Sequence, residues 1–558
     1  MKTACLYVAI LAMLIPHRDL TSCILAITGA SCIEELDESE VEHYSRLHDN
    51  PLPINRCSKS RLVSSGLFTP YQAASIIDYR SRTGDILSLT ELSLVDGLTQ
   101  DRAAYLAPFI TFSTSGTTGP ARASAHKAIF RLSVREKEGT QSCTAVKYSA
   151  DIQDRVKLNW AERNTYTRQA HTPGTMSMEY DSRCMAARFI IGDFSARFGQ
   201  GLACWSGFSL SGYPTITSFR RNGSGITPSS SFSPSERGVA TVATRGNCSI
   251  SAALSAKGFR DRMEGRNVPV SMFPVANATW HGRTASLGFT ATGEAVSLDL
   301  RAGTAGTSMF GEFAAVKGKP TALAGVIRTP SYGSSYGMNI RYNIEGHSGI
   351  AAGFQGRLTQ ATVDSDYRHD RSEIQFKTIC THSRKYAAGA FELTPSIRIS
   401  QRWKPSDGDT GLRTDLRSEI EARWRELAIR SRLDILWCKR SSWLTYTEAG
   451  YESNGSRRCR ISLWARWTLF KVDNWDDRIY AYERDVPGYF NVPAYYGRGW
   501  AASAAGGMKA RHQQLNARLA WTTYPWTMPA KSSVLEFRIQ YTLSITTTPS
   551  RVDARKRS

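Results

Sequence analysis

Residues 534–545 read VLEFRIQYTLSI, and the polarity of their side chains alternates along the chain. After Val534, the odd positions carry Leu535, Phe537, Ile539 and three further apolar or aromatic residues, whereas the even positions carry Glu, Arg, Gln, Thr and Ser. Successive side chains of a β strand point to opposite faces of the sheet. The stretch therefore predicts a strand with one apolar face and one polar face.

The same alternation recurs throughout residues 123–546, with examples at 155–160, 339–344, 427–435 and 460–469. A soluble β-sandwich alternates in the same way, so a soluble secreted β protein is one interpretation. More than 400 residues of this pattern carry no predicted helix. Many segments reach the roughly 9–11 residues that a tilted strand needs to cross a bilayer, and closing such a sheet removes its unpaired edges. The pattern therefore favours a mainly β fold, a large antiparallel transmembrane β-barrel.

The size of the barrel follows from the length of the patterned region. About 425 residues, at about 26 residues for a strand and its loop, give on the order of 16 strands. Ten of the 13 Trp lie between Trp403 and Trp526, many beside charged residues or at segment ends. Such rings are typical of a membrane–water boundary, and Trp residues in the core of a soluble β protein are the alternative.

The N-terminus predicts export. Residues 1–30 combine Lys2 with two apolar stretches and small residues near Ala30, as in a signal peptide. Cys23 follows a lipoprotein-like pattern, so its lipidation is an alternative. After the N-terminus no run approaches the roughly 18 uncharged apolar residues of a membrane helix. An exported barrel indicates the outer membrane, with membrane lipid as a partner.

No pattern points to an enzyme or to a bound cofactor. The 11 Cys and 10 His are scattered without the spacing of a metal site, so we expect no metal and no cofactor. Residues 333–337 (GSSYG) have the spacing of a nucleophile elbow, but the alternating strand that follows lacks the required helix. We therefore expect a protein without enzymatic activity.

The net charge of +21 is unevenly distributed. An acidic helical segment at 31–50 precedes a nearly neutral region at 51–112, so the basic excess belongs to the barrel at 123–546 and to the tail at 547–558. Several bases fall on the polar faces of predicted strands: Arg155, Lys157, Arg341, Arg430, Arg432, Arg460, Arg466 and Arg538. Facing a lumen, they would either attract an anion or pair with lumen acids.

Residues 51–112 interrupt the strand pattern with short helices and glycine turns, before a Ser, Thr and Gly linker at 113–122. Two copies of helix, glycine turn and helix lie about thirty residues apart. This layout resembles the tandem helix-hairpin-helix module of competence-type DNA-binding proteins. The resemblance implies hairpin N–H groups that bind a DNA phosphate, and the candidate residues are Gly66, Leu67, Gly97, Leu98, Lys59, Arg61 and Arg102.

The module departs from that family at both hairpins. Phe68 and Thr99 follow the Gly-Leu pairs where the family pattern has a second glycine. Non-specific DNA binding needs several phosphate neutralisations, and the module carries a net charge near +1. A packing or docking module without DNA affinity is therefore the alternative.

Residues 188–240 carry the wider resemblance. They contain Gly192-Asp193-Phe194, Gly199-Gln200-Gly201 and a long polar loop. With the acidic segment and the module, they resemble Bacteroidota helix-hairpin-helix proteins that have a C-terminal outer-membrane β-barrel. Glycine pairs permit close backbone approach, so the segment is predicted to fold over or into the lumen. It forms either a constriction or a seal, and the candidate constriction residues are Arg197, Arg220, Arg221, Gly199 and Gly201.

Two functions stay open at this point. In the first, a porin-like outer-membrane barrel with a helix-hairpin-helix module, in the periplasm or inside the barrel, binds or passes DNA or another polyanion. In the second, the protein has a structural or docking role, and the module plugs the barrel or binds a periplasmic protein partner. The sequence determines neither the cargo nor the oligomeric state.

Overall fold

A computed structural model of the chain describes residues 20–30, 32–36, 38–49, 51–112, 124–152, 155–165, 170–182, 187–206, 215–229, 236–257, 269–329, 334–343, 348–356, 358–368, 371–405, 411–453, 459–529 and 531–547. Most of the predicted signal peptide, the linker at 113–122 and nearly all of the basic tail lie outside these residues.

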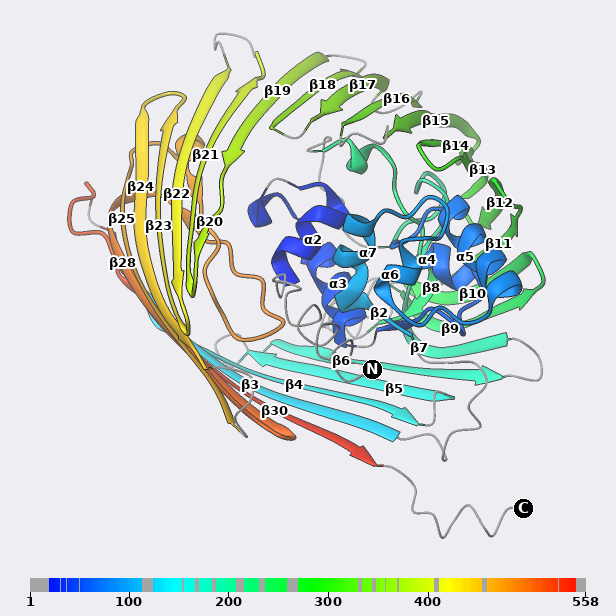
Figure 1. Ribbon diagram of the computed structural model, residues 1–558, viewed down its shortest axis with the longest axis horizontal. Coiled ribbons are helices and arrows are strands. Elements are labelled where there is room, and N and C mark those ends of the chain that lie inside the picture. Colours follow the sequence, from blue (N-terminus) through cyan, green and yellow to red (C-terminus); the bar gives the residue numbers. More distant parts are fainter. Residues whose placement is uncertain are drawn as a thin grey trace, which may run out of the picture.

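The described residues form a closed antiparallel barrel of 24 strands (Figure 1). The first half of its wall consists of β3 (Ser124–Glu136), β4 (Thr140–Ile152), β5 (Val156–Thr165), β6 (Ala170–Ser182), β7 (Ala187–Arg197), β9 (Glu236–Arg245), β10 (Cys248–Lys257), β11 (Ser271–His281), β12 (Ala285–Thr292), β13 (Ala295–Gly303), β14 (Thr307–Val316) and β15 (Lys319–Arg328). The second half consists of β16 (Ser335–Asn343), β17 (Ser348–Gln355), β18 (Thr359–Arg368), β19 (Arg371–Ser383), β21 (Phe391–Trp403), β22 (Leu412–Trp424), β23 (Leu427–Trp437), β24 (Ser441–Glu452), β25 (Cys459–Val472), β28 (Gly497–Ala510), β29 (Gln513–Thr523) and β30 (Val534–Thr547).

The barrel closes where β3 pairs with β30, in a register that joins Ser124 to Thr547 and Glu136 to Leu535. Two short strands, β8 (Gly225–Pro228) and β20 (Tyr386–Ala388), pair with β7 and β21 without adding to the wall. The expected count of about 16 strands is therefore wrong. From Ser124 to Thr547, each of the 24 strands with its connection takes about 18 residues rather than about 26, because most connections are tight turns.

Polarity alternates across the wall as the sequence predicts. On β13, Leu298 is 51% exposed on the outside, whereas the neighbouring Asp299 is 6% exposed on the inside. On β30, Leu535 and Phe537 are exposed, whereas Arg538 is buried. A closed barrel with paired backbone and an apolar outer surface is the strand arrangement that a bilayer accepts. The coarser prediction, a β-barrel of the outer-membrane type, is confirmed.

The Trp residues divide between the two faces. Trp403, Trp424 and Trp437 are exposed at the ends of their strands, as expected for rings at a membrane boundary. Trp464 differs from that expectation, because it is buried on the inner face of β25, where the Arg484 guanidinium lies 3.5 Å from the centre of its ring. Its parity on the strand places it inside.

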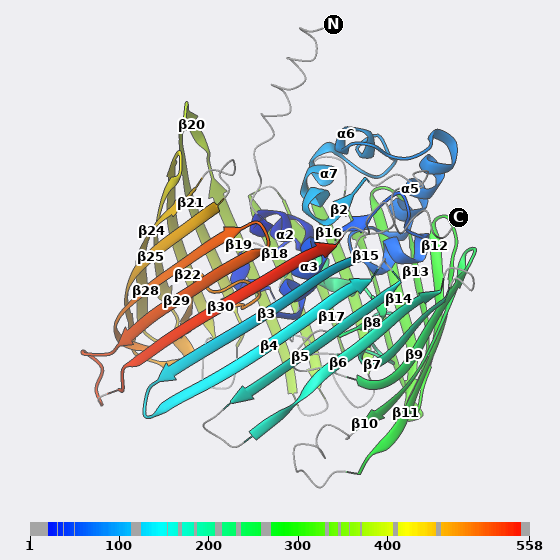
Figure 2. The ribbon, with the colours of Figure 1, turned by 90° about the horizontal axis from the view of Figure 1, so that it is seen from below.

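The helical part consists of α2 (Leu20–Thr28), η1 (Ile33–Glu35), α3 (Glu38–Asp49), α4 (Lys59–Ser64), α5 (Pro70–Thr83), α6 (Leu89–Leu92), α7 (Gln100–Leu106) and η2 (Ala107–Phe109), with the parallel pair β1 (Leu52–Pro53) and β2 (Ile110–Thr111). No described helix has the length and apolar character needed to cross a membrane. Seen down the barrel, the helices lie within the ring of strands (Figure 1), and α6 and α7 lie toward one end (Figure 2).

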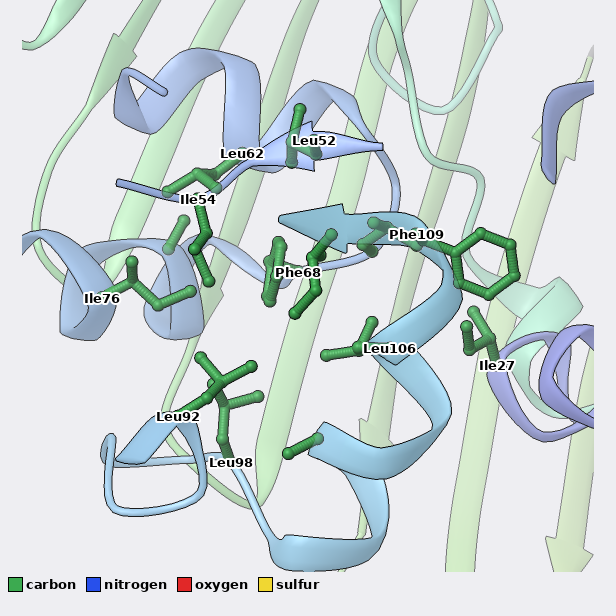
Figure 3. Close-up of a cluster of buried hydrophobic side chains, with 14 of the residues drawn as sticks. Ile27, Leu52, Ile54, Leu62, Phe68, Ile76, Leu92, Leu98, Leu106 and Phe109 are labelled. Atoms are coloured by element: carbon green, nitrogen blue, oxygen red, sulfur yellow. The ribbon is translucent and has the colours of Figure 1, made fainter. Parts of the chain in front are cut away.

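The module has its own apolar core, in which Leu62, Leu92 and Leu106 are completely buried (Figure 3). Asn55 joins the two helical pairs, because its side-chain amide donates to the Ile86 carbonyl (2.8 Å) and accepts from the Ile86 N–H (2.9 Å). Helix α5 begins with Pro70 and a capping box, in which the side chains of Thr69 and Gln72 each accept a hydrogen bond from the other's backbone N–H. Helix α2 packs on this core, and cleavage near Ala30, which stays a prediction, would remove it.

Candidate functional site

The acidic segment touches the barrel wall through two consecutive carboxylates at the end of η1. Glu34 accepts hydrogen bonds from Arg432 (2.6 Å) and Arg417 (3.3 Å), and from the backbone N–H of Tyr482 (3.2 Å). Glu35 accepts from Arg398 (2.7 Å) and Lys377 (3.0 Å).

The four bases form one group on the inner face of the wall. They come from β19, β21, β22 and β23, which are neighbours in the sheet. We call Lys377, Arg398, Arg417 and Arg432 the basic ladder, and the ladder together with Glu34 and Glu35 the clasp. The wall adds Asp434, which accepts from Arg417 (2.9 Å) and Arg432 (2.7 Å).

The clasp is shielded from solvent. The side chain of Glu34 is 8% exposed and that of Arg432 is 3% exposed. Burial alone would raise the pKa of Glu34, but the positive charges of Arg417 and Arg432 outweigh it and lower the pKa well below its usual range. Next to it, burial and the charge of Glu35 raise the pKa of the Cys32 thiol to about 11. Glu34 is therefore ionised in the docked arrangement.

A second inward segment completes this contact. Residues 473–496, which we call the inward loop, connect β25 to β28 and contain η4 (Trp475–Asp477), β26 (Ile479–Tyr480) and β27 (Ala494–Tyr495). Its Tyr482 donates to Glu34 and accepts from Arg466 at 2.6 Å. The inward loop therefore lies between the acidic segment and the wall.

Ion pairs fix the inward loop to the lumen face. Glu483 pairs with Arg518, Asp485 pairs with Arg538, and Arg484 pairs with Glu448 (3.2 Å). Sequence reasoning missed this element. Its signal was a break of more than 20 residues in the alternation, with Glu483 and Asp485 just before a Pro-Gly turn.

The bases that the sequence assigns to the lumen are paired with acids in several places. Arg341 pairs with Asp364 at 2.7 Å, and Arg466 pairs with Glu448 at 2.9 Å. Arg430 lies 2.7 Å from an acceptor oxygen of Glu421. Arg155 is exposed at a turn, and Arg460 is exposed near the start of β25. Charge pairing inside the barrel, one of the two interpretations, therefore accounts for much of this basic excess.

The segment after β7 is held against the wall by a buried carboxylate. Glu312 on β14 accepts from the backbone N–H groups of Gln200 (2.6 Å), Leu202 (3.1 Å) and Ala203 (3.4 Å). Gly199 and Gly201 have φ values of +57° and +87°, which turn these N–H groups toward one acceptor. The predicted close backbone approach at the glycine pair thus serves an internal anchor.

The three candidate constriction arginines lie along this segment. Arg197 and Arg221 lie over the ring of Trp205, at 5.5 and 5.3 Å from its centre. Arg220 donates to Ser308 on β14 at 2.8 Å. Burial, with the positive charge of Arg301, lowers the pKa of Arg220 to about 10. A role for these residues in a constriction stays a prediction.

Most of the candidate phosphate-binding residues of the module lie at one of three places: the first hairpin, a contact with the barrel wall, or the second hairpin. Arg102 donates to the Leu67 carbonyl at 3.2 Å, which brings it to the first hairpin beside Gly66. Lys59 donates to the carbonyls of His281 (3.3 Å) and Gly282 on the barrel.

At the second hairpin, Gly97 packs under the ring of Tyr71, and Leu98 is buried. Arg61 is exposed. Most of these side chains therefore make contacts inside the protein, and DNA binding by this set stays a prediction.

A cavity of about 1850 Å³, which we call the chamber, lies between the helical part and the wall. Its described lining comes mainly from β3–β5, β28–β30, the inward loop and the acidic segment. Of the charged residues in this lining, 13 are Lys or Arg and 5 are Asp or Glu. Ile33, Leu36 and Tyr482 line the chamber beside the clasp. Among the described residues, no group of three or more His, Cys, Asp or Glu is placed to hold a metal ion.

No family model matches this chain, and no curated protein matches it. Similar solved structures include OccK5 (OpdH) of Pseudomonas aeruginosa, with 8% identity over 77% of this chain and 100% of that chain, at a TM-score of 0.29. The translocation pore of the P pilus usher PapC has 10% identity over 76% of this chain and 100% of that chain, at a TM-score of 0.39. OccK2 (OpdF) of Pseudomonas aeruginosa has 8% identity over 76% and 98%, at a TM-score of 0.30. At these scores the similarities carry no argument about function.

Proposed function

We propose that this protein is an outer-membrane channel that its own N-terminal segment, residues 31–112, holds closed. The observation that carries the proposal is the clasp, in which two adjacent carboxylates engage four bases on four neighbouring wall strands. Lys59 provides a second attachment on the opposite part of the wall, at the turn after β11. Attachment at both places holds a plug across the lumen.

The chemistry of the clasp suits a plug that can be released. Buried ion pairs add little net stability compared with apolar packing, but removing one partner of such a pair costs about 3–5 kcal/mol, because the other charge stays buried without a partner. Apolar packing between plug and wall would make docking permanent, whereas charged contacts can be exchanged for water or for other ions. We therefore infer a gate rather than a permanent seal.

A second candidate function is the capture or passage of a polyanion such as DNA. The charge of the chamber favours it, since its described lining holds 13 bases and 5 acids. The structural alternative, in which the module binds a periplasmic protein partner, would use the exposed Leu87 and Leu94 on either side of α6, since Arg61 lines the chamber.

Conductance in planar lipid bilayers tests the closure. We expect the full chain to conduct weakly, and the double variant Glu34→Gln with Glu35→Gln to conduct several-fold more at the same voltage. The matched control is Asp78→Asn, which removes a carboxylate from the same module but breaks an exposed pair with Arg82 at 3.0 Å. Equal conductance of wild type, double variant and control would show that the clasp does not close the channel.

A further inference from the structure

The basic ladder is positively charged once the acidic segment leaves it. Lys377, Arg398, Arg417 and Arg432 contribute four positive charges, and Asp434 contributes one negative charge from the wall. Release of Glu34 and Glu35 therefore leaves a net charge of about +3 in this group. A charge of this kind in a partly enclosed lumen is costly unless anions replace the lost partners.

The geometry of the ladder selects for a chain of anions. Neighbouring strands lie about 4.8 Å apart, so four adjacent strands spread the bases over roughly 14 Å. Three of the four bases are arginines, whose planar groups bind carboxylate and phosphate through paired hydrogen bonds. The charged groups converge in pairs, because Lys377 and Arg398 meet at Glu35 whereas Arg417 and Arg432 meet at Glu34. The ladder therefore suits at least two linked anionic groups, such as consecutive units of one polymer.

The chamber gives such a polymer access to the ladder. Ile33 and Leu36, which flank the two clasp glutamates, line the chamber, and so does Tyr482, whose N–H contacts Glu34. The basic excess of the lining concentrates anions at this place. The chamber therefore reaches the residues on either side of the two carboxylates that occupy the ladder.

We propose that the basic ladder is a binding site for a linear phosphate polymer, and that Glu34 and Glu35 occupy it as an internal competitor. The inference rests on the proposed closure by residues 31–112. Binding of the polymer displaces the two carboxylates, so cargo and plug exclude each other. The clasp is then a recognition site as well as an attachment.

The test uses the full chain in planar bilayers with inorganic polyphosphate as the probe. With wild type, polyphosphate is expected to raise the conductance, and orthophosphate at equal phosphate concentration is expected to have little effect. With the Glu34→Gln and Glu35→Gln variant, the ladder is already free, so polyphosphate is expected to bind there and reduce the current. An oligodeoxythymidylate arm shows whether a nucleic-acid backbone serves as the same kind of ligand.

Adding Lys377→Gln and Arg398→Gln to that double variant isolates the ladder. We expect the half-blocking concentration of polyphosphate to rise at least tenfold, and the far-ultraviolet circular dichroism of the barrel to stay unchanged. If Glu34→Gln with Glu35→Gln raises conductance but polyphosphate acts on neither protein, the closure stands and the inference is wrong. If the half-blocking concentration does not change, the polymer binds elsewhere in the chamber and the ladder assignment is wrong.

Discussion

The single substitution Glu34→Gln tests the clasp most directly. It removes the charge that Arg432 and Arg417 share, and it leaves a guanidinium that is 3% exposed with Asp434 as its acidic neighbour. Loss of one partner of a buried ion pair costs about 3–5 kcal/mol, and we expect the lower end because the Arg432–Asp434 bond remains. About 3 kcal/mol corresponds to roughly a hundredfold increase in the population of the undocked segment.

Cys32 reports this population, because it lies two residues before Glu34. In the docked state, burial and Glu35 raise the pKa of its thiol to about 11, which keeps it protonated and slow to react. The thiol is partly exposed in the docked state, and undocking exposes it fully, so that its pKa returns to about 8.5. We therefore expect maleimide labelling of Cys32, measured by peptide mass spectrometry, to become up to about a hundredfold faster in Glu34→Gln.

Cys57 serves as the internal control, since it is buried in the apolar core of the module. Its labelling rate should not change if the segment undocks as a unit. A rate for Cys32 within threefold of wild type would refute the argument from charge burial. A parallel rise at Cys57 would show unfolding of the module instead of undocking.

Three further predictions concern pH, the anchored segment and the outer wall. Docking lowers the pKa of Glu34, so the contribution of Glu34 to the stability of docking is complete above about pH 4.3 and is lost as the pH falls further. Wild-type conductance should therefore be equal at pH 7 and pH 5 and higher near pH 3. A rise in conductance already between pH 7 and pH 5 would contradict the assignment to Glu34. Glu312→Gln weakens the hydrogen bonds from three backbone N–H groups and should destabilise the segment around residues 200–203 by about 1–3 kcal/mol. The expected readout is amide hydrogen exchange that becomes faster in this segment but not in β30. Unchanged exchange would mean that the glycine turn is stable without these hydrogen bonds. Leu298→Arg on the outer face should destabilise the barrel folded in lipid vesicles by up to about 2–4 kcal/mol, measured by urea titration. The control Glu294→Arg, at the neighbouring exposed turn, should have little effect. Equal effects of the two substitutions would argue against a lipid-facing wall.

The alternation of polarity was readable from sequence because it is local. In residues 534–545, each side chain's face depends only on the parity of its position, and the structure places Phe537 outside and Arg538 inside as predicted. The module was readable for the same reason, since the cap at Thr69 and the glycine turns at Gly66 and Gly97 are set by neighbouring residues. The strand count failed because loop lengths, unlike strand parity, leave no periodic signal.

The clasp could not be read from sequence. Glu34 and Glu35 appeared as part of a generic acidic segment, and their basic partners lie 342 to 398 residues away along the chain. The inward loop was also missed, because its partners Arg518 and Arg538 are distant in sequence and resemble every other base on a lumen face.

By itself, the sequence determined which face of each strand is apolar and that a small helical module precedes the barrel. Both features depend only on residues that are close together in the sequence. Closure of 24 strands, and the choice of Lys377, Arg398, Arg417 and Arg432 as partners for two glutamates, were decided only by the tertiary structure. The physical reason is that charge pairing acts through space, so it depends on which strands the closed wall brings together and not on their order in the chain.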